Sequence, residues 1–181
     1  MTVRRFLISL TLTGLAALGV LTASATAQAS TPRESDPVTA PADSGAVSIL
    51  VTKLSHADAT SRLRSSGITW SSSGGCSDRN NSTCTSFEQV NLATIQGAQT
   101  LKSASGCGLN VTGGTETGHA SGTYSHWNGY KLDFSLNTCI SNYIRNNFTS
   151  IGGNKWESRA GNIYYLESNH WDVTFYNCGG C

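Results

Sequence analysis

Two short stretches of the sequence combine histidines with carboxylates at spacings that suit a metal site. The first contains His126 and Asp133. The second contains Glu167, His170 and Asp172. Imidazole nitrogens and carboxylate oxygens are the ligands of catalytic zinc, which typically keeps three protein ligands and an open fourth position. His126, Asp133 and His170 supply three such ligands, and Glu167 remains as a carboxylate that is free to move a proton.

A zinc ion held in this way predicts hydrolysis of an amide bond without a covalent intermediate. The metal lowers the pKa of a bound water from about 15.7 toward 7 and polarises the scissile carbonyl. Glu167 would take the proton and pass it to the leaving amine. His119 lies upstream in a glycine-rich link and is a candidate for stabilising charge in the transition state. Taken singly, each residue is more often a packing residue or a cap, and Asp133 could cap a following helix.

The backbone must bring His126 and Asp133 together, because their odd spacing would place them on opposite faces of one straight strand. Asn128-Gly129 is a strong signal for a two-residue hairpin turn. Such a turn would pair His126 with Lys131, so that Asp133 would lie diagonal to His126 on the same face. A histidine and an aspartate in this arrangement can meet at one metal ion.

The second stretch follows the same logic. Ser168-Asn169 is a plausible two-residue turn between two segments rich in β-forming residues. Glu167 and His170 would then face each other directly. Tyr165 and Asp172 would form the next pair on that face.

The remaining periodicity predicts an α+β domain, with N-terminal helices packed on a small antiparallel sheet that ends in a meander. Disulfides are expected to stabilise it. The predicted helices span Ser55–Ser66, Phe87–Ser105 (capped by Thr85 or Ser86 and ended by Gly106) and Leu136–Phe148. The predicted strands span Ile68–Ser71, Leu109–Thr112, Lys155–Ser158, Asn162–Glu167 and His170–Asn177.

The N-terminus has the pattern of a secretory signal peptide. Arg4 and Arg5 precede the apolar run Phe6–Leu21, which is followed by A-x-A type cleavage sites. This run is shorter than the roughly 20 residues that a spanning helix needs, and no later run is long enough. We therefore expect a secreted protein without a membrane span. Its expected parts are a signal peptide (1–29), a flexible linker or short pro-segment (30–46) and a zinc peptidase domain (47–181).

Charge and cysteine content narrow the possible partners. The chain holds 12 Lys or Arg and 11 Asp or Glu, for a formal net charge of +1, which argues against a nucleic-acid surface or a polybasic membrane surface. We expect a monomer. The chain has six cysteines, and an even number in an exported small domain favours disulfides. Proximity favours Cys76 with Cys84, whereas the other pairings stay open. A zinc site at Cys178 and Cys181 lacks a second such pair.

The two stretches together resemble the motifs of a known family, the zinc DD-peptidases. His126-x2-Gly129-x-Lys131-x-Asp133 resembles the family's Ser-x-His-x-x-Gly-x-Ala-x-Asp motif, although Ser125 here directly precedes the histidine and lysine replaces the small residue. Glu167-x2-His170 resembles the family's Glu-x-x-His. The family includes D-Ala-D-Ala carboxypeptidases, L-alanyl-D-glutamate endopeptidases and the hedgehog signalling domain. The similarity covers roughly residues 55 to 177.

The resemblance implies a hedgehog or DD-peptidase type of fold around one Zn²⁺. It implies His126, Asp133 and His170 as metal ligands, and Glu167 as the general base. The implied substrate is the stem peptide or cross-link of bacterial peptidoglycan. Other members have His-x-His where this chain has His170-Trp171-Asp172, so Asp172 is an alternative ligand.

One departure from the family bears on the bond that is cut. Many members carry an upstream arginine that binds a substrate carboxylate, and Glu116 stands near that position. An anion there would repel a terminal carboxylate, which favours an endopeptidase over a D-Ala-D-Ala carboxypeptidase. The alternative function is a non-catalytic zinc-fold binding or signalling module, although such a module has no need of Glu167. A disulfide-stapled structural protein whose histidines bind nothing is the remaining alternative.

Overall fold

The computed structural model describes residues 51–176, and all of them belong to one unit of the chain, Ala46–Cys181. The expected signal peptide (1–29), the expected linker (30–46), Cys178 and Cys181 lie outside the described residues. The expectations for those segments stay predictions. Within residues 51–176, no helix is long and apolar enough to cross a bilayer.

Helices α1 and α3 begin at side-chain caps. The Ser55 side chain accepts a hydrogen bond from the Asp58 amide, and the Asn137 side chain accepts one from the Ile140 amide. Such caps satisfy amides that have no partner inside the helix. The helices predicted around Ala57 and Ile144 are confirmed. The three helices of the described residues are α1 (His56–Ser65), α2 (Leu92–Ser105) and α3 (Thr138–Asn147).

Helix α2 begins later than the periodicity predicts. Its first residue is Leu92, and the expected start at Phe87 is wrong. Gln89 has a φ of 64°, a left-handed conformation that a right-handed helix cannot include. Phe87 is fully buried for a different reason, because it packs its ring against His56 and Trp70. The predicted end at Gly106 is confirmed, with a left-handed φ of 65°.

A seven-stranded sheet forms the second layer, with strand order β2-β4-β5-β9-β8-β7-β6. Strands β2 and β4 are parallel, and the other neighbouring pairs are antiparallel. The α+β prediction is confirmed, but the sheet is larger than expected because the segment after α3 forms a hairpin at one edge. It is also a mixed sheet and not the purely antiparallel one expected, because β2 and β4 are parallel. The strands are β2 (Thr69–Trp70), β4 (Asn110–Gly113), β5 (Lys131–Ser135), β6 (Thr149–Gly152), β7 (Lys155–Glu157), β8 (Ile163–Leu166) and β9 (His170–Thr174); β1 (Lys53–Leu54) and β3 (Val90–Asn91) form a separate pair.

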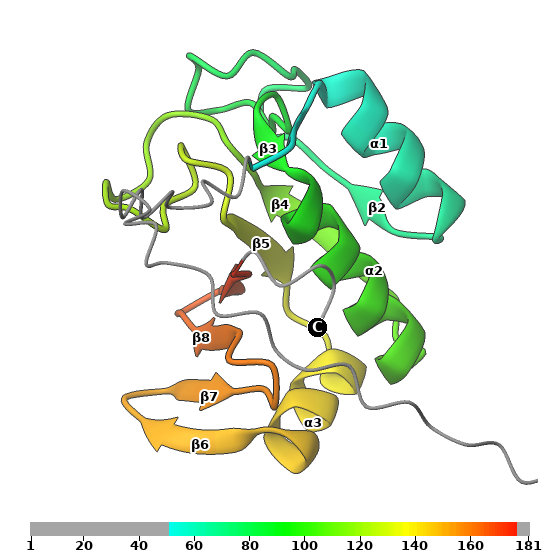
Figure 1. The fold of residues 1–181 in the computed structure, drawn as a ribbon, viewed down its shortest axis with the longest axis vertical. Coiled ribbons are helices and arrows are strands. Elements are labelled where there is room, and N and C mark those ends of the chain that lie inside the picture. The colour runs from blue at the N-terminus through cyan, green and yellow to red at the C-terminus, as the bar shows by residue number, and fades with distance from the viewer. Residues whose placement is uncertain (1–50, 177–181) are drawn as a thin grey trace, which may run out of the picture. The chain divides into compact units, whose positions relative to one another are not determined.

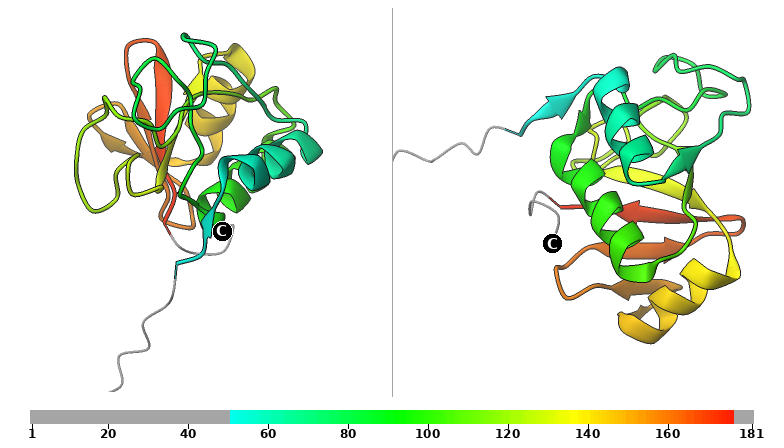
Figure 2. Two further views of the ribbon diagram at one scale, coloured as in Figure 1. Left: turned by 90° about the horizontal axis from the view of Figure 1, so that it is seen from above. Right: turned by 90° about the vertical axis from the view of Figure 1, so that its right-hand side faces the viewer.

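Helices α1 and α2 cover one face of the sheet (Figures 1 and 2). Leu132 and Phe134 of β5 and Trp171 of β9 belong to the core and are at most 1% exposed. A Cβ atom at Gly97 of α2 would lie 2.3 Å from the Phe175 ring, so the absence of a side chain allows this close approach. Because side chains alternate along a strand, the intervening residues of β5 and β9 lie on the opposite face.

Two disulfides join parts of the chain outside the central strands. Cys76 and Cys84 are bonded, as their proximity in the sequence predicts. Cys107 and Cys139 are bonded across a sequence separation of 32, a pairing that the sequence left open. The second bond ties the segment that follows α2 to α3. The expectation of a disulfide-stabilised domain is therefore confirmed for these four cysteines.

Candidate functional site

The candidate site lies on the face of the sheet opposite the core residues of β5 and β9. In the register of these two strands, Asp133 pairs with Asp172, and Ser135 pairs with His170. Lys131 lies two residues before Asp133 and therefore shares its face. Its Nζ donates to both carboxylate oxygens of Asp172, at 2.9 and 2.8 Å. Strand alternation thus gathers several titratable side chains at one place.

The hairpin between β8 and β9 forms as predicted. The amide of Glu167 donates to the carbonyl of His170 at 3.0 Å, which leaves Ser168 and Asn169 as the two loop residues. Glu167 therefore faces His170, and its Oε2 lies 3.4 Å from the His170 Nε2. Tyr165 is the partner of Asp172 in the β8–β9 register, again as predicted.

The predicted hairpin at Asn128-Gly129 is wrong, because residues 125–128 are not in a strand. The amide of Gly129 donates to the His126 carbonyl at 2.8 Å, and the amide of Tyr130 donates to the Ser125 carbonyl at 3.1 Å. Together with a φ of 80° at Gly129, this is the hydrogen-bond pattern of a Schellman motif. A single helical turn, not a hairpin, therefore delivers His126 to the face of β5.

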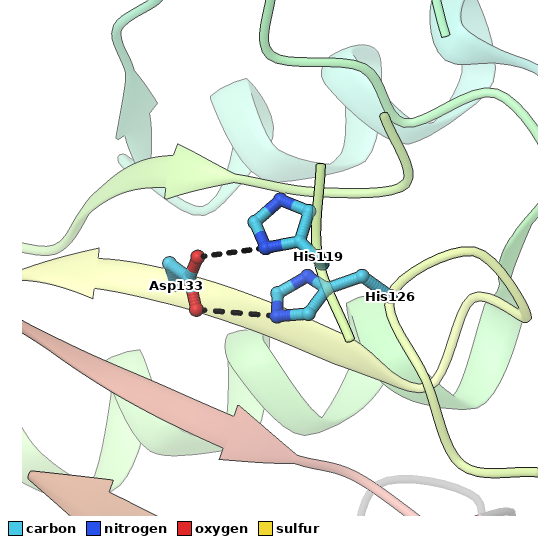
Figure 3. A group of neighbouring side chains, drawn as sticks. All are labelled: His119, His126 and Asp133. Carbon is cyan, nitrogen blue, oxygen red and sulfur yellow. Dashed lines mark ion pairs between the residues drawn. The ribbon is translucent and has the colours of Figure 1, made fainter. Parts of the chain in front are cut away.

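Asp133 is the centre of the cluster, and three histidines direct a ring nitrogen toward it. Its Oδ1 lies 3.3 Å from the His126 Nε2 and 3.5 Å from the His170 Nε2. Its Oδ2 lies 3.7 Å from the His119 Nδ1. Figure 3 shows the His119 and His126 rings side by side with their nitrogens toward the carboxylate.

Each of these histidines is anchored through its other ring nitrogen. The His126 Nδ1 lies 2.7 Å from the Gly114 carbonyl, and the His119 Nε2 lies 3.2 Å from the Glu116 Oε1. The His170 Nδ1 lies 2.8 Å from the Asn169 Oδ1. These oxygens accept hydrogen bonds, so the anchored nitrogen carries the proton and, in a neutral ring, the nitrogen that faces Asp133 carries the lone pair. Histidines that bind metals are held in this manner.

Two buried atoms in the cluster have no hydrogen-bond partner, namely the His126 Nε2 and the Asp133 Oδ1. Their separation of 3.3 Å allows an ion pair, but their geometry is not that of a hydrogen bond. Ligand atoms that bind a tetrahedral zinc ion at 2.0–2.2 Å lie about 3.3 Å from one another. The donor set and its spacing therefore fit a metal ion. His119, His126 and Asp133 form a group whose ligand atoms all lie within 4.8 Å of one another.

A glycine makes room for the central carboxylate. Gly113 of β4 is the cross-strand partner of Asp133. A Cβ atom at this position would lie 2.4 Å from the Asp133 Oδ2, well inside van der Waals contact. Any larger residue at Gly113 would displace the carboxylate from the cluster.

The charged groups of the cluster stabilise one another in their charged forms. Burial lowers the pKa of His126, but its contacts with Asp133 and Asp172 outweigh this effect and raise that pKa to about 9. Burial raises the pKa of Asp172, but the nearby His126, whose Nε2 lies 3.7 Å from the Asp172 Oδ2, and the hydrogen bonds from Lys131 outweigh this effect, so that its pKa lies below the usual range. Without a metal, His126 is therefore protonated at neutral pH. In the metal-free protein, the added proton of His126 supplies the positive charge between the Asp133 and Asp172 carboxylates.

The stacking of the His119 and His126 rings limits which of them can bind one ion. Their centroids are 3.8 Å apart and their planes differ by 16°. A nitrogen lone pair lies in the plane of its ring, so one ion cannot lie in both of these nearly parallel planes at about 2.0–2.1 Å from each nitrogen. In this arrangement, only one of the two histidines can ligate well, and His126 has the unpartnered nitrogen.

A cavity of about 320 Å³ opens onto the cluster and brings together every site residue that the sequence predicted. The Glu167 side chain is 39% exposed, so its carboxylate can meet a water or a substrate. Sequence reasoning missed the anchoring contacts of Gly114 and Glu116, which lie just beyond β4. The cavity is lined by Gly118, His119, Ala120, His126, Lys131, Asp133, Glu167, His170 and Asp172.

In comparisons with known proteins, no family model, curated protein or solved structure matches the chain.

Proposed function

We propose that this protein is a zinc-dependent peptidase whose metal centre is built on Asp133. The observation that carries the proposal is the pair of unpartnered buried atoms, the His126 Nε2 and the Asp133 Oδ1, which face each other at 3.3 Å. Buried polar atoms normally have partners, so an unmet pair in a cavity indicates a missing ligand. Two nitrogens and one oxygen are typical donors for zinc.

His170 is the third ligand in this proposal. Its Nε2 lies 3.5 Å from the Asp133 Oδ1, close to the spacing expected between two ligands of one tetrahedral ion. His170 is outside the group whose ligand atoms all lie within 4.8 Å of one another, so its ring must move toward His126 when the metal binds. The alternative ligand Asp172 already accepts two hydrogen bonds from Lys131. His119 is held apart by its stacking on His126 and is left to act on the substrate.

Glu167 acts as the general base. It lies beside His170 at the rim of the cavity and has enough exposure to reach a water molecule. A bound zinc ion supplies Lewis-acid activation of water and polarisation of the scissile carbonyl. Glu167 accepts the proton from the attacking water and donates it to the leaving amine. His119 directs its Nδ1 into the same cavity, where it can receive a hydrogen bond.

The substrate proposed from the motif resemblance is the stem peptide or cross-link of peptidoglycan. Lys131 is the single Lys or Arg among the residues that line the cavity, and Asp172 occupies its ammonium group. A carboxypeptidase needs a free cation for the terminal carboxylate of its substrate. We therefore favour endopeptidase cleavage.

The test uses the mature protein, with zinc content measured first and fragments released from purified muropeptides identified by mass spectrometry. We expect about one zinc per chain and cleavage of an internal amide bond. Glu167→Gln should keep the zinc and lose about 100- to 10,000-fold in kcat, because it removes the proton-transfer group. Glu157→Gln, an exposed carboxylate on β7 that lies outside the cavity, should change neither quantity.

Each outcome has a defined meaning. Full activity in Glu167→Gln would contradict the mechanism. Zinc binding without cleavage of any peptide would favour the binding or signalling module. A chain that binds no zinc would overturn the proposal altogether.

A further inference from the structure

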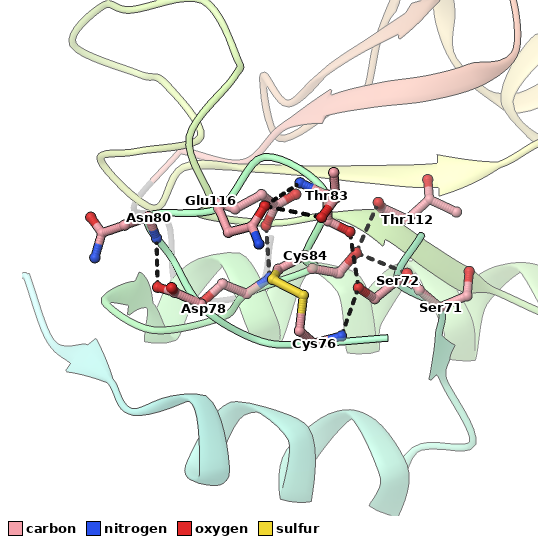
Figure 4. The surroundings of a disulfide bond; sticks show 12 residues. Ser71, Ser72, Cys76, Asp78, Asn80, Thr83, Cys84, Thr112 and Glu116 are labelled. Carbon is pink, nitrogen blue, oxygen red and sulfur yellow. Dashed lines mark hydrogen bonds between the residues drawn. A yellow bond between two sulfur atoms is a disulfide. The ribbon is translucent and has the colours of Figure 1, made fainter. Parts of the chain in front are cut away.

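Glu116 is a buried carboxylate with no part in the chemistry proposed above. Its side chain is 3% exposed, and it lies where the segment after β4 meets the loop closed by Cys76 and Cys84 (Figure 4). Burial of a charge is costly unless hydrogen bonds satisfy it. The partners of this carboxylate therefore indicate why an acid is placed here.

The two oxygens of Glu116 have different partners. Oε2 accepts from the Ser86 amide at 2.7 Å and from the Gly114 amide at 3.1 Å. Oε1 accepts from the Gly114 amide at 3.0 Å and lies 3.2 Å from the His119 Nε2. Both oxygens thus hold the Gly114 amide, Oε2 also holds the Ser86 amide, and Oε1 also reaches the histidine.

The contact with Oε1 decides which nitrogen of His119 carries a proton. A carboxylate oxygen accepts hydrogen bonds, so the Nε2 must donate. In the neutral ring, the Nδ1 then keeps its lone pair. This Nδ1 faces the Asp133 Oδ2 across 3.7 Å, so two acceptors border the same small space in the cavity. An O–H or N–H donor between them would be bound by both.

We propose that Glu116 is a positioning residue that fixes the tautomer of His119 and thereby keeps its Nδ1 as a hydrogen-bond acceptor beside the metal site. The ligand that this acceptor takes is a water or a substrate amide N–H. This role rests on the proposed function, because it requires that His119 contacts the water or the substrate at the proposed zinc site. It also replaces the view of Glu116 as a repulsive group in a substrate pocket, since its carboxylate is occupied by backbone amides and His119.

The first measurement needs neither metal nor activity. Nitrogen-15 NMR of the metal-free protein reports which ring nitrogen of each neutral histidine carries the proton. We expect His119 to carry it on Nε2. A proton on Nδ1 in the neutral ring would overturn the proposal, whatever the protein is found to hydrolyse.

Glu116→Gln tests the contact itself. With its amide oxygen in the place of Oε2, glutamine can keep the bond from Ser86 while it presents an NH₂ donor to His119. We expect the His119 proton to move to Nδ1, kcat to fall about 10-fold and the zinc content to stay unchanged, in line with the loss of an outer-shell partner. An unchanged tautomer and an unchanged kcat would show that Glu116 is only structural.

Glu88→Gln is the matched control. Glu88 also holds a backbone amide, that of His56, but it makes no contact with the cluster. It should leave the His119 tautomer and kcat as they are. If Glu116→Gln does not fold, the wild-type tautomer still decides the proposal. If the wild type hydrolyses no peptide, the tautomer still tests the positioning role, so the two failures are distinguishable.

Discussion

Two regions of the molecule place a histidine beside a carboxylate, and they behave in opposite ways. At the start of α1, the His56 Nδ1 accepts from the Phe87 amide at 3.1 Å, and the His56 ring stacks on Phe87. The Glu88 Oε2 accepts from the His56 amide at 2.9 Å. Burial lowers the pKa of His56, and the charge of Glu88 opposes this only in part. This corner is a packed and satisfied piece of structure.

The Asp133 cluster has the same residue types but unmet hydrogen-bonding groups. The His126 Nε2 and the Asp133 Oδ1 have no partner, and the pKa of His126 is raised, not lowered. The carboxylates around His126 outweigh the effect of its burial. A histidine near an acid is therefore weak evidence for a site, whereas unpartnered buried atoms beside a raised pKa are strong evidence.

The largest expected difference between the two regions is in metal affinity. Asp133→Asn should weaken zinc binding about 100- to 1,000-fold, because a zinc binding free energy of about 10–16 kcal/mol, shared among four ligands, is about 2.5–4 kcal/mol for each of them. Glu88→Gln should leave zinc affinity unchanged. Isothermal titration calorimetry of both variants measures this. Equal zinc affinities of the Asp133→Asn and Glu88→Gln variants would show that the Asp133 cluster does not differ from the His56 region in metal binding.

The next-largest expected difference is in how the stability of the metal-free protein depends on pH. The pKa of His126 is raised to about 9, so its contribution to stability is complete below about 6.5 and is lost as pH rises through 9. The loss amounts to about 3 kcal/mol for a shift of this size. The pKa of His56 is lowered, so its contribution is present above about 6.5 and is lost as pH falls.

Urea unfolding between pH 5 and 10 separates the two contributions. His126→Gln should remove the loss of stability at alkaline pH, and His56→Gln should change only the loss of stability at acidic pH. Excess zinc should also suppress the alkaline loss in the wild type, because the ion replaces the proton. An alkaline loss that persists in His126→Gln would assign it to another group.

The strand-borne part of the cluster could be predicted from the sequence, because it depends on local periodicity. The alternation along β5 and β9 and the two-residue turn at Ser168-Asn169 are enough to place Asp133, His170 and Glu167 on one face. Helices α1 and α3 were predictable for the same reason, since each has a capping side chain beside an apolar period.

The loop-borne part could not be predicted, because it depends on contacts distant in the sequence. The anchor of Glu116 is the amide of Ser86, 30 residues away. A Cβ atom at Gly114 would lie 2.0 Å from the Ser86 carbonyl oxygen, so the close approach of these two segments sets the position of the loop. The dipeptide Asn128-Gly129 suits both a hairpin and a Schellman motif, and the surrounding packing selects the second.

The smallest expected effect lies inside the cluster and concerns Asp172. Its carboxylate is satisfied by Lys131, as Glu88 is satisfied by the His56 amide, whereas the Asp133 Oδ1 is not satisfied. Asp172→Asn should therefore change zinc affinity by less than about 10-fold, and His170→Gln should weaken it about as much as Asp133→Asn does. If Asp172→Asn instead loses the metal while His170→Gln retains it, Asp172 is the third ligand, and Lys131 must release it when the metal binds.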